Sequence, residues 1–147
     1  MVHQVVVRKA IIEEIDWINA QYDKVDFKHS VYENEHIAIA ESDGQRIGLG
    51  RLQYIEDGVG ELGGMYVNEE YRRFGVAHKI VEYLIKNSQK YRIIYCIPFS
   101  HLDCFYRQFG FVSEKNLAEV PRKIVDKYSW CQSAYESPTV LLVINRT

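Results

Sequence analysis

Two glycine signals between residues 58 and 77 have the spacing to hold a phosphate group. Gly58, Gly60 and Gly63 spell G-x-G-x-x-G, which in dinucleotide-binding proteins joins a strand to the helix that receives a pyrophosphate. Here Gly63 runs into the strand-like GMYV, and no helical pattern begins for roughly another ten residues. We therefore interpret these glycines as a bend or bulge in a strand, where a ligand can approach the backbone.

The second signal, YRRFGVA, lies where phosphate chemistry requires it. It spells R-x-x-G-x-A and stands between the strand-like MYV and an amphipathic pattern that begins near Val76. Backbone N–H groups at a helix N-terminus attract anions, and Gly75 lets oxygen atoms come close to the backbone. Arg72 and Arg73 add positive charge at the same place. Taken alone, these residues also fit a surface turn with solvated arginines.

The elements that must position this loop alternate between strand and helix. Strands are predicted in VHQVVVR, EHIAIAES, QRIGLGRLQYI, GVGELGGMYV, YRIIYCIPF, FVSE and TVLLVIN. Helices are predicted in KAIIEEIDWINAQY, from Val76 to about Lys90, in SHLDCFYRQF and from Pro121 onward. The pair Asp43-Gly44 indicates a tight hairpin turn. This order predicts a mixed sheet with helices on its faces, in the α/β class.

Length and charge limit the class of protein. The chain has 147 residues, of which 47% are hydrophobic and 26% charged, so it can bury one sizeable core but is too short for two ordinary domains. We expect a single domain over residues 1–147. The 18 basic and 20 acidic residues alternate along the chain, which favours neither a nucleic acid nor a membrane as a partner.

The N-terminal segment and the cysteines indicate a cytoplasmic protein without a metal site. Charges at Glu13, Glu14 and Asp16 follow a short apolar run, unlike a secretory signal or a membrane span. The three cysteines and five histidines show no metal-ligand spacing. We therefore expect reduced thiols, a cytoplasmic location and no bound metal.

A second motif downstream gives the loop its context. The string CFYRQFGFV, residues 104–112, contains the spacing F-Y-x-x-x-G-F. With the loop, it makes the stretch from Gly60 to Val112 resemble the GNAT superfamily of acyl-CoA-dependent N-acyltransferases. The acetyl-CoA loop of that family, (Q/R)-x-x-G-x-(G/A), matches Arg72–Ala77, and the family's F-Y-x-x-x-G-F string follows in the right order.

This resemblance implies a GNAT-like fold whose largely antiparallel mixed sheet is splayed at the acetyl-CoA site. It implies that main-chain amides of the loop bind the pyrophosphate, and that the strand before the loop pairs its backbone with the pantetheine arm. The residues that it assigns to acetyl-CoA are Met65, Tyr66, Val67, Arg72, Arg73, Phe74, Gly75, Val76, Ala77 and Tyr106.

The same resemblance implies catalytic roles for two residues. Tyr106 matches a tyrosine that hydrogen-bonds the thioester sulfur and protonates the departing thiolate, and Glu61 matches a strand glutamate that in some members accepts the proton of the attacking amine. The chemistry requires such groups, because an amine is protonated at neutral pH and must lose a proton before it attacks. A backbone N–H near Met65 can stabilise the oxyanion. The alternatives are a solvated Glu61 with a water chain as the base, and a Tyr106 that only packs its ring.

We therefore expect an N-acetyltransferase that moves an acetyl group from acetyl-CoA to a primary amine of a small molecule, such as an amino acid or a polyamine. The tail VPRKIVDKYSWCQSAYESPTVLLV resembles the tails of small amino-acid N-acetyltransferases of the N-acetylglutamate synthase kind, which supports this acceptor class. The alternatives are a protein N-acetyltransferase and a non-catalytic acyl-CoA-binding regulatory module of the same fold. A homodimer is compatible with exposed edge strands.

Aromatic and cationic side chains are the candidates for the acceptor pocket. Small-molecule pockets are mostly apolar with a few placed polar groups. The aromatic candidates are Tyr22, Phe27 and Tyr32 on one side and Tyr128, Trp130 and Tyr135 on the other, with Arg122, Lys123 or Lys127 for a substrate carboxylate. The aromatics are equally compatible with an ordinary core.

Overall fold

Seven strands make up the sheet of the computed structural model, which describes residues 4–147. They are hydrogen-bonded in the order β1-β2-β3-β4-β5-β7-β6. Their bounds are β1 Val5–Lys9, β2 Glu35–Ser42, β3 Gln45–Glu56, β4 Val59–Val67, β5 Ile93–Cys96, β6 Val112–Ser113 and β7 Leu142–Asn145. The pairs β1–β2, β2–β3, β5–β7 and β6–β7 are antiparallel, and β4–β5 is parallel. The predicted mixed, largely antiparallel sheet is confirmed.

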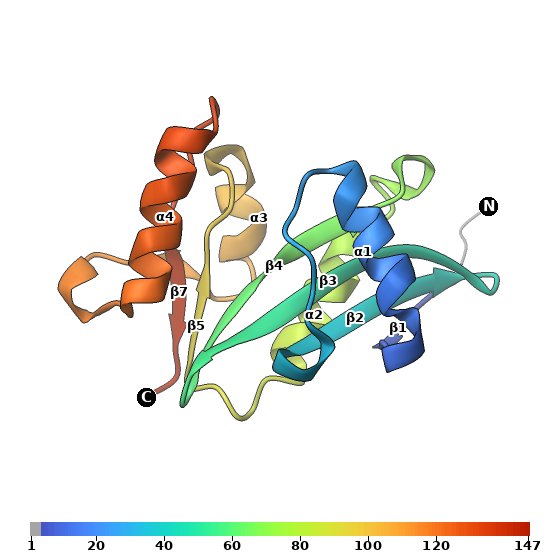
Figure 1. Cartoon of the computed structure of the whole chain (residues 1–147), viewed down its shortest axis with the longest axis horizontal. Coiled ribbons are helices and arrows are strands. Elements are labelled where there is room, and N and C mark those ends of the chain that lie inside the picture. Colours follow the sequence, from blue (N-terminus) through green and yellow to red (C-terminus); the bar gives the residue numbers. More distant parts are fainter. Residues whose placement is uncertain (1–3) are drawn as a thin grey trace. The chain divides into compact units, whose positions relative to one another are not determined.

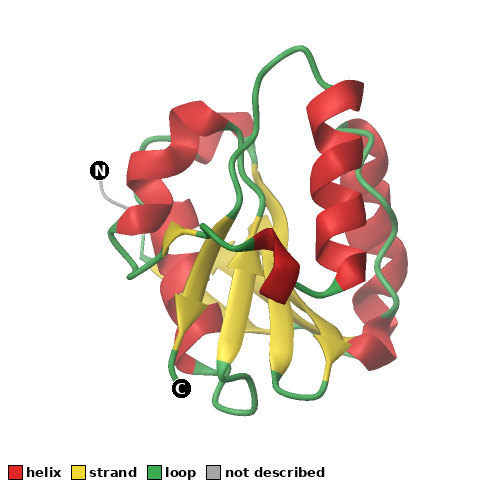
Figure 2. Ribbon diagram, turned by 90° about the vertical axis from the view of Figure 1, so that its left-hand side faces the viewer, coloured by secondary structure: helices red, strands yellow, loops and turns green. Residues whose placement is uncertain are grey.

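Helices and short 3-10 turns connect the strands (Figure 2). Their bounds are α1 Ile15–Lys24, α2 Val76–Lys86, α3 Asp103–Arg107 and α4 Arg122–Ala134, with short 3-10 turns η1 Ile12–Glu14, η2 Tyr32–Asn34, η3 Glu69–Tyr71, η4 Ser100–Leu102 and η5 Leu117–Glu119. Contacts between Cα atoms divide the chain into two compact units. The first unit comprises the residues up to Gln53 together with Gly63–Gln89, and the second comprises Tyr54–Leu62 and Lys90–Thr147.

The first unit places one helix on each face of its strands. In Figure 1, α1 lies in front of β2 and β3, and α2 lies behind them. Ile18 and Tyr22 of α1 are fully buried against Ile37, Ile39 and Leu49 of the sheet. On the other side, α2 buries Val76, Ile80, Val81 and Leu84. Burial of these two apolar faces is the main force that holds both helices to the strands.

A network of charges fixes the start of α1. Both carboxylate oxygens of Glu14 accept hydrogen bonds of 2.8 Å from Arg8 of β1, and one also accepts the N–H of Ile11 at 3.0 Å. Arg46 of β3 approaches the same carboxylate at 3.3 Å. The bidentate geometry makes this pair stronger than an ordinary surface ion pair.

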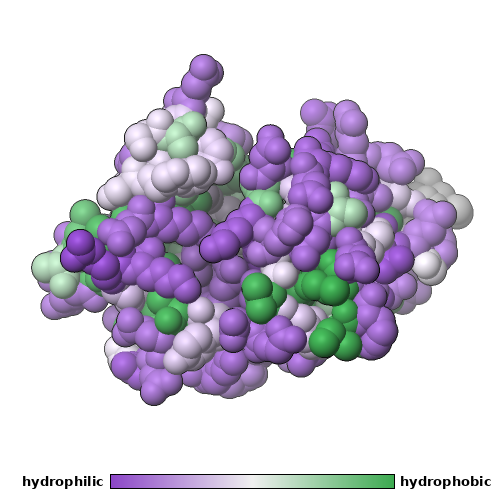
Figure 3. Space-filling model, in the orientation of Figure 1, coloured by the Kyte–Doolittle hydropathy of each residue, from purple (hydrophilic) through white to green (hydrophobic). Residues whose placement is uncertain are grey.

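The start of α1 and the end of α2 differ from the sequence prediction, and α3 is shorter than the segment predicted for it. The regular helix starts at Ile15, later than the predicted segment, because the preceding residues form η1 and leave Ile11 and Ile12 exposed. Exposed hydrophobic residues appear as green areas on a mostly hydrophilic face (Figure 3). The second helix ends at Lys86 and not near Lys90, because the Asn87 side chain bonds the carbonyl of Tyr83 at 2.8 Å and interrupts the helix. Such local side-chain bonds compete with helix continuation.

The predicted hairpin turn is confirmed. Asp43 and Gly44 both have positive φ, at 52° and 76°, between β2 and β3. Two consecutive residues of this kind form the turn whose twist matches antiparallel strands.

The second unit packs α4 against its strands. Ile124 of α4 is buried in a cluster with Val59 of β4, Tyr95 of β5 and Val143 of β7. Glu61 is the register partner of Tyr95 on the parallel strand pair, so both side chains lie on the face that α4 covers. This placement decides which groups surround Glu61.

Candidate active site

The loop from Arg72 to Ala77 is an exposed turn that leads directly into α2. Arg72, Arg73 and Phe74 are all exposed, and Gly75 is the N-cap of the helix. Arg72 is held in place because its Nε donates to the carbonyl of Val67 at 3.1 Å. Arg73 and Gly75 both have positive φ, at 73° and 77°. Successive backbone N–H groups in such a conformation form a concave site for anions.

The beginning of α2 is suited to a negatively charged ligand. Gly75, as the N-cap, has no side chain with which to satisfy the amides of the first turn, and that turn contains no acidic residue. A Cβ added to Gly75 would meet no heavy atom within 4 Å among the described residues. The space above the glycine is therefore open to a ligand that approaches the positive end of the helix.

The burial of β4, the strand before the loop, changes along its length. Val59–Leu62 are buried, whereas Gly63 to Val67 are only half-buried. Gly64 has a φ of +61°, which interrupts regular strand geometry as the sequence predicts for these glycines. Its carbonyl accepts a hydrogen bond of 2.8 Å from the hydroxyl of Tyr22. Met65, Tyr66 and Val67, the residues predicted to bind pantetheine, follow this irregular point.

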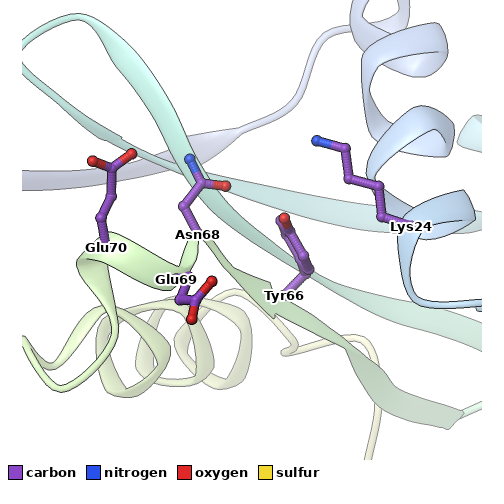
Figure 4. Close-up of a pocket in the computed structure, with 5 residues that line it drawn as sticks. All are labelled: Lys24, Tyr66, Asn68, Glu69 and Glu70. Atoms are coloured by element: carbon purple, nitrogen blue, oxygen red, sulfur yellow. The ribbon is translucent and has the colours of Figure 1, made fainter.

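A polar pocket of about 480 Å³ lies beside this strand in the first unit. It is lined by Lys24, Tyr66, Asn68, Glu69 and Glu70 (Figure 4). Lys24 comes from the end of α1 and Tyr66 from β4, and the other three residues follow β4 on the way to the loop. The pocket combines one ammonium group with two carboxylates, so it can hold a ligand that carries charges of both signs.

In the second unit, the predicted base Glu61 is buried and paired. Its side chain is 5% exposed, and its Oε2 accepts a hydrogen bond from Nζ of Lys127 on α4. The lysine is 44% exposed and connects the carboxylate to solvent. The alternative of a solvated strand glutamate is therefore wrong. The sequence gives no sign of this pairing, since the two residues are 66 positions apart, and Lys127 was only one of three candidates for a substrate carboxylate.

The predicted acid Tyr106 is also buried. It lies in α3 with 5% of its surface exposed, and its ring makes edge contacts with Phe105 and Phe111 of the same sequence string. Burial, together with the nearby Cys96 thiol, raises the pKa of Tyr106 above its ordinary value. A tyrosine with a raised pKa keeps its proton at neutral pH and can donate it.

The aromatic candidates for the acceptor pocket separate into different environments. Tyr22 is fully buried in the core of the first unit, and Tyr32 packs against the same cluster with its hydroxyl on the Ala10 carbonyl, which bears out the core alternative for both residues. Trp130 on α4 is 59% exposed and packs edge-on against Tyr135. Arg122 is highly exposed and pairs with Asp126 at 3.4 Å. Trp130, Arg122, Lys123 and Lys127 are the exposed members of this candidate set.

Within residues 4–147, no three His, Cys, Asp or Glu side chains are arranged to hold a metal ion. In the same part of the chain, no helix combines the length and apolar character needed to cross a bilayer.

Sequence comparison identifies the family. Residues 33–113, more than half of the chain, match the model of the acetyltransferase (GNAT) domain. This match spans the loop, β4, α2 and the string that contains Tyr106. Comparison with curated proteins finds no match.

Solved structures share the fold. N-acetylglutamate synthase from Neisseria gonorrhoeae, complexed with coenzyme A and N-acetyl-glutamate, aligns at a TM-score of 0.73 with 17% identity over 98% of this chain, which spans 35% of that enzyme. Rv2747 from Mycobacterium tuberculosis, in complex with CoA and NLQ, aligns at 0.73 with 16% identity over 95% of this chain and 98% of that one. The ribosomal-protein-S18-alanine N-acetyltransferase from Escherichia coli aligns at 0.68 with 10% identity over 96% and 93% of the two chains.

Proposed function

Because the chain belongs to the GNAT acetyltransferase family, we propose that it transfers an acetyl group from acetyl-CoA to a primary amine of a small molecule. The observation that carries this proposal is the exposed loop with Gly75 at the N-cap of α2, where open space meets the positive end of a helix. The two aligned structures crystallised with coenzyme A agree with acetyl-CoA as the donor.

The donor is held by the first unit in this proposal. Main-chain amides of Arg72–Ala77 bind the pyrophosphate, with Arg72 and Arg73 adding charge. The half-buried backbone of Met65–Val67 pairs with the pantetheine arm as an added strand would. Such pairing uses backbone hydrogen bonds and does not depend on which side chains stand at these positions. The backbone geometry of the strand, and not the identity of its side chains, therefore selects the cofactor.

The reaction is a direct attack. The amine nitrogen forms a bond to the thioester carbonyl carbon, the carbon–sulfur bond breaks, the nitrogen loses a proton and the sulfur gains one. In this proposal Tyr106 supplies the proton to the thiolate, and Glu61, or water in contact with it, receives the proton of the amine. The Met65 N–H donates to the oxyanion of the tetrahedral intermediate. The ion pair with Lys127 requires the lysine to shift or to relay the proton when Glu61 acts.

A small charged acceptor is supported by the polar pocket beside Tyr66. Its mixture of one cation and two carboxylates fits an amino acid or a polyamine.

We also propose that residues 1–147 form one domain that works in the cytoplasm. The terminal strands of the sheet order, β1 and β6, are edges through which a homodimer can form.

The test of donor binding uses two matched glycines. Gly75 and Gly44 have φ values of +77° and +76°, and a Cβ on either would meet no described atom within 4 Å. Gly75→Ala and Gly44→Ala therefore introduce similar backbone strain, but only Gly75→Ala places a methyl group where the pyrophosphate is proposed to lie. At one hundred times its dissociation constant, acetyl-CoA should stabilise the wild type by about 2.7 kcal/mol.

The Gly44→Ala variant should keep this stabilisation relative to its own ligand-free form, and Gly75→Ala should lose most of it. An equal shift in both variants contradicts the proposed donor site. Release of free thiol from acetyl-CoA, measured across a panel of amino acids, polyamines and peptide N-termini, then identifies the acceptor. Binding of acetyl-CoA without turnover of any amine would favour the non-catalytic module.

A further inference from the structure

Tyr22 of α1 is joined to β4 at Gly64, where the backbone of that strand has a positive φ. Its hydroxyl donates to the carbonyl oxygen of Gly64 at 2.8 Å, and the side chain is fully buried. A Cβ on Gly64 would lie 2.6 Å from the Tyr22 hydroxyl and 2.7 Å from Nε of Arg51, distances that a real Cβ does not tolerate. The positive φ and the missing side chain of Gly64 are therefore both needed for this contact.

Arg51 holds the Tyr22 ring in place. The guanidinium carbon lies 4.3 Å from the centre of the ring, in cation–π geometry. Arg51 itself is buried, donates from one terminal nitrogen to the hydroxyl of Ser30 at 2.7 Å, and lies 4.0 Å from Glu35. Burial also raises the pKa of the Tyr22 phenol, so the hydroxyl remains a hydrogen-bond donor over the physiological range. The Gly64 carbonyl thus faces a donor with little freedom to move.

The direction of this carbonyl fixes the direction of the next amide. In a trans peptide group the C=O and the N–H are coplanar and point in opposite directions, and the described residues contain no cis peptide. The Gly64 oxygen points toward the Tyr22 hydroxyl, so the N–H of Met65 points away from it. Rotation of this one peptide group would move the Gly64 oxygen and the Met65 N–H together.

We propose that Tyr22 is a positioning residue for acetyl transfer, which holds the Gly64–Met65 peptide so that the Met65 N–H is aimed at the thioester oxygen. This inference rests on the proposed function and adds a residue whose side chain does not itself touch the reacting atoms. A donor for an oxyanion is effective when it is oriented before the charge develops, since reorientation during the reaction is then unnecessary.

The chain supplies a matched control. Tyr32, also in the first unit, donates from its hydroxyl to the carbonyl of Ala10 at 2.9 Å. Tyr22→Phe and Tyr32→Phe each remove one hydroxyl that bonds a backbone carbonyl and leave the aromatic ring in place. A purely structural role for Tyr22 predicts that the two variants behave alike.

The experiment compares melting temperature, kcat and KM for acetyl-CoA in the wild type and both variants, with the best amine found in the panel. Tyr22→Phe should lower kcat at least tenfold and change KM for acetyl-CoA less than threefold, because removal of a whole oxyanion donor costs about 100-fold or more. Tyr32→Phe should keep kcat within twofold. Both should show similar decreases in melting temperature.

Arg51→Lys provides a second variant, should Tyr22→Phe fold poorly. It keeps the positive charge near Glu35 but lacks the planar group that stacks on Tyr22, so kcat should fall in the same direction. Similar kcat values for Tyr22→Phe and Tyr32→Phe, or an unchanged kcat in Arg51→Lys, would overturn the positioning role and leave the proposed function standing. A wild type that acetylates no amine would overturn the proposed function, and this inference with it.

Discussion

Glu14 should control how the stability of this protein depends on pH. Its side chain is 9% exposed, and both oxygens are bonded by Arg8 at 2.8 Å. The hydrogen bonds from Arg8 are the largest cause that lowers the pKa of Glu14 from 4.5 to about 2, with the Ile11 N–H contributing. One pKa unit corresponds to about 1.36 kcal/mol, so this shift is worth about 3 kcal/mol of folding free energy.

The sign of the pH effect follows from the lowered pKa. A carboxylate whose pKa is lower in the folded state contributes its full stability above the unfolded value, and the contribution is lost as the pH falls toward the folded value. For Glu14 the window lies between pH 4.5 and about pH 2. By pH 3 the contribution of Glu14 should have fallen to about half or less of its value at pH 7.

Glu14→Gln removes the charge and keeps the shape of the side chain. Urea unfolding at pH 7 should show a loss of about 3 kcal/mol, which shrinks steadily below pH 4.5. Glu13→Gln is the control, because Glu13 lies in the same 3-10 turn but is exposed, and its effect should stay within about 0.5 kcal/mol. Equal effects of the two variants at pH 7, or a loss for Glu14→Gln that does not change between pH 7 and pH 3, would refute the reasoning.

Four further predictions concern the candidate site. Tyr106→Phe should lower kcat far more than the affinity for acetyl-CoA, and because burial raises the pKa of Tyr106, the wild-type rate should show no fall from this group as the pH rises to 9. Glu61→Gln should lower kcat at neutral pH because it removes the proposed base, and an unchanged kcat assigns the base to water or another residue. Lys127→Met should lower the free energy of unfolding by about 2 kcal/mol, since it leaves the Glu61 carboxylate buried without its cation, and addition of Glu61→Gln should recover most of the loss in urea unfolding. Trp130→Ala should raise KM for the amine and leave KM for acetyl-CoA nearly unchanged in steady-state kinetics, and equal changes in both constants would argue against an acceptor contact.

Local signals in the sequence predicted most of the fold. The Asp43-Gly44 turn, the start of α2 at Val76 and the loop that ends at Gly75 each depend on residues close together in the chain, and each appears in the structure as predicted. The end of α2 was predicted near Lys90, four residues beyond its observed end at Lys86, because the sequence pattern does not reveal that the Asn87 side chain bonds the carbonyl of Tyr83 and interrupts the helix.

Contacts between distant residues could not be predicted in the same way. The partner of Glu61 is 66 positions away, and the hydroxyl that bonds Gly64 is 42 positions away. No periodic pattern relates residues at such separations, and their proximity follows only from the register of the strands and the packing of the helices. The sequence therefore indicates which groups can do chemistry, whereas the structure shows which neighbours hold them.

The two units are interleaved along the chain, and this affects the order in which they can form during synthesis. All residues of the first unit have left the ribosome once Gln89 emerges. Tyr54–Leu62 emerge before that point, but they belong to the second unit. Val59–Leu62 must wait for their parallel partners Ile93–Cys96, and β5 in turn waits for β7 near the C-terminus. A nascent chain that stops after Gln89 therefore carries a complete first unit and the segment Val59–Leu62, whose edge toward β5 has no strand to pair with. Strand edges left open in this way are prone to aggregate, so truncated translation products of this protein should depend on chaperones more than the finished chain does.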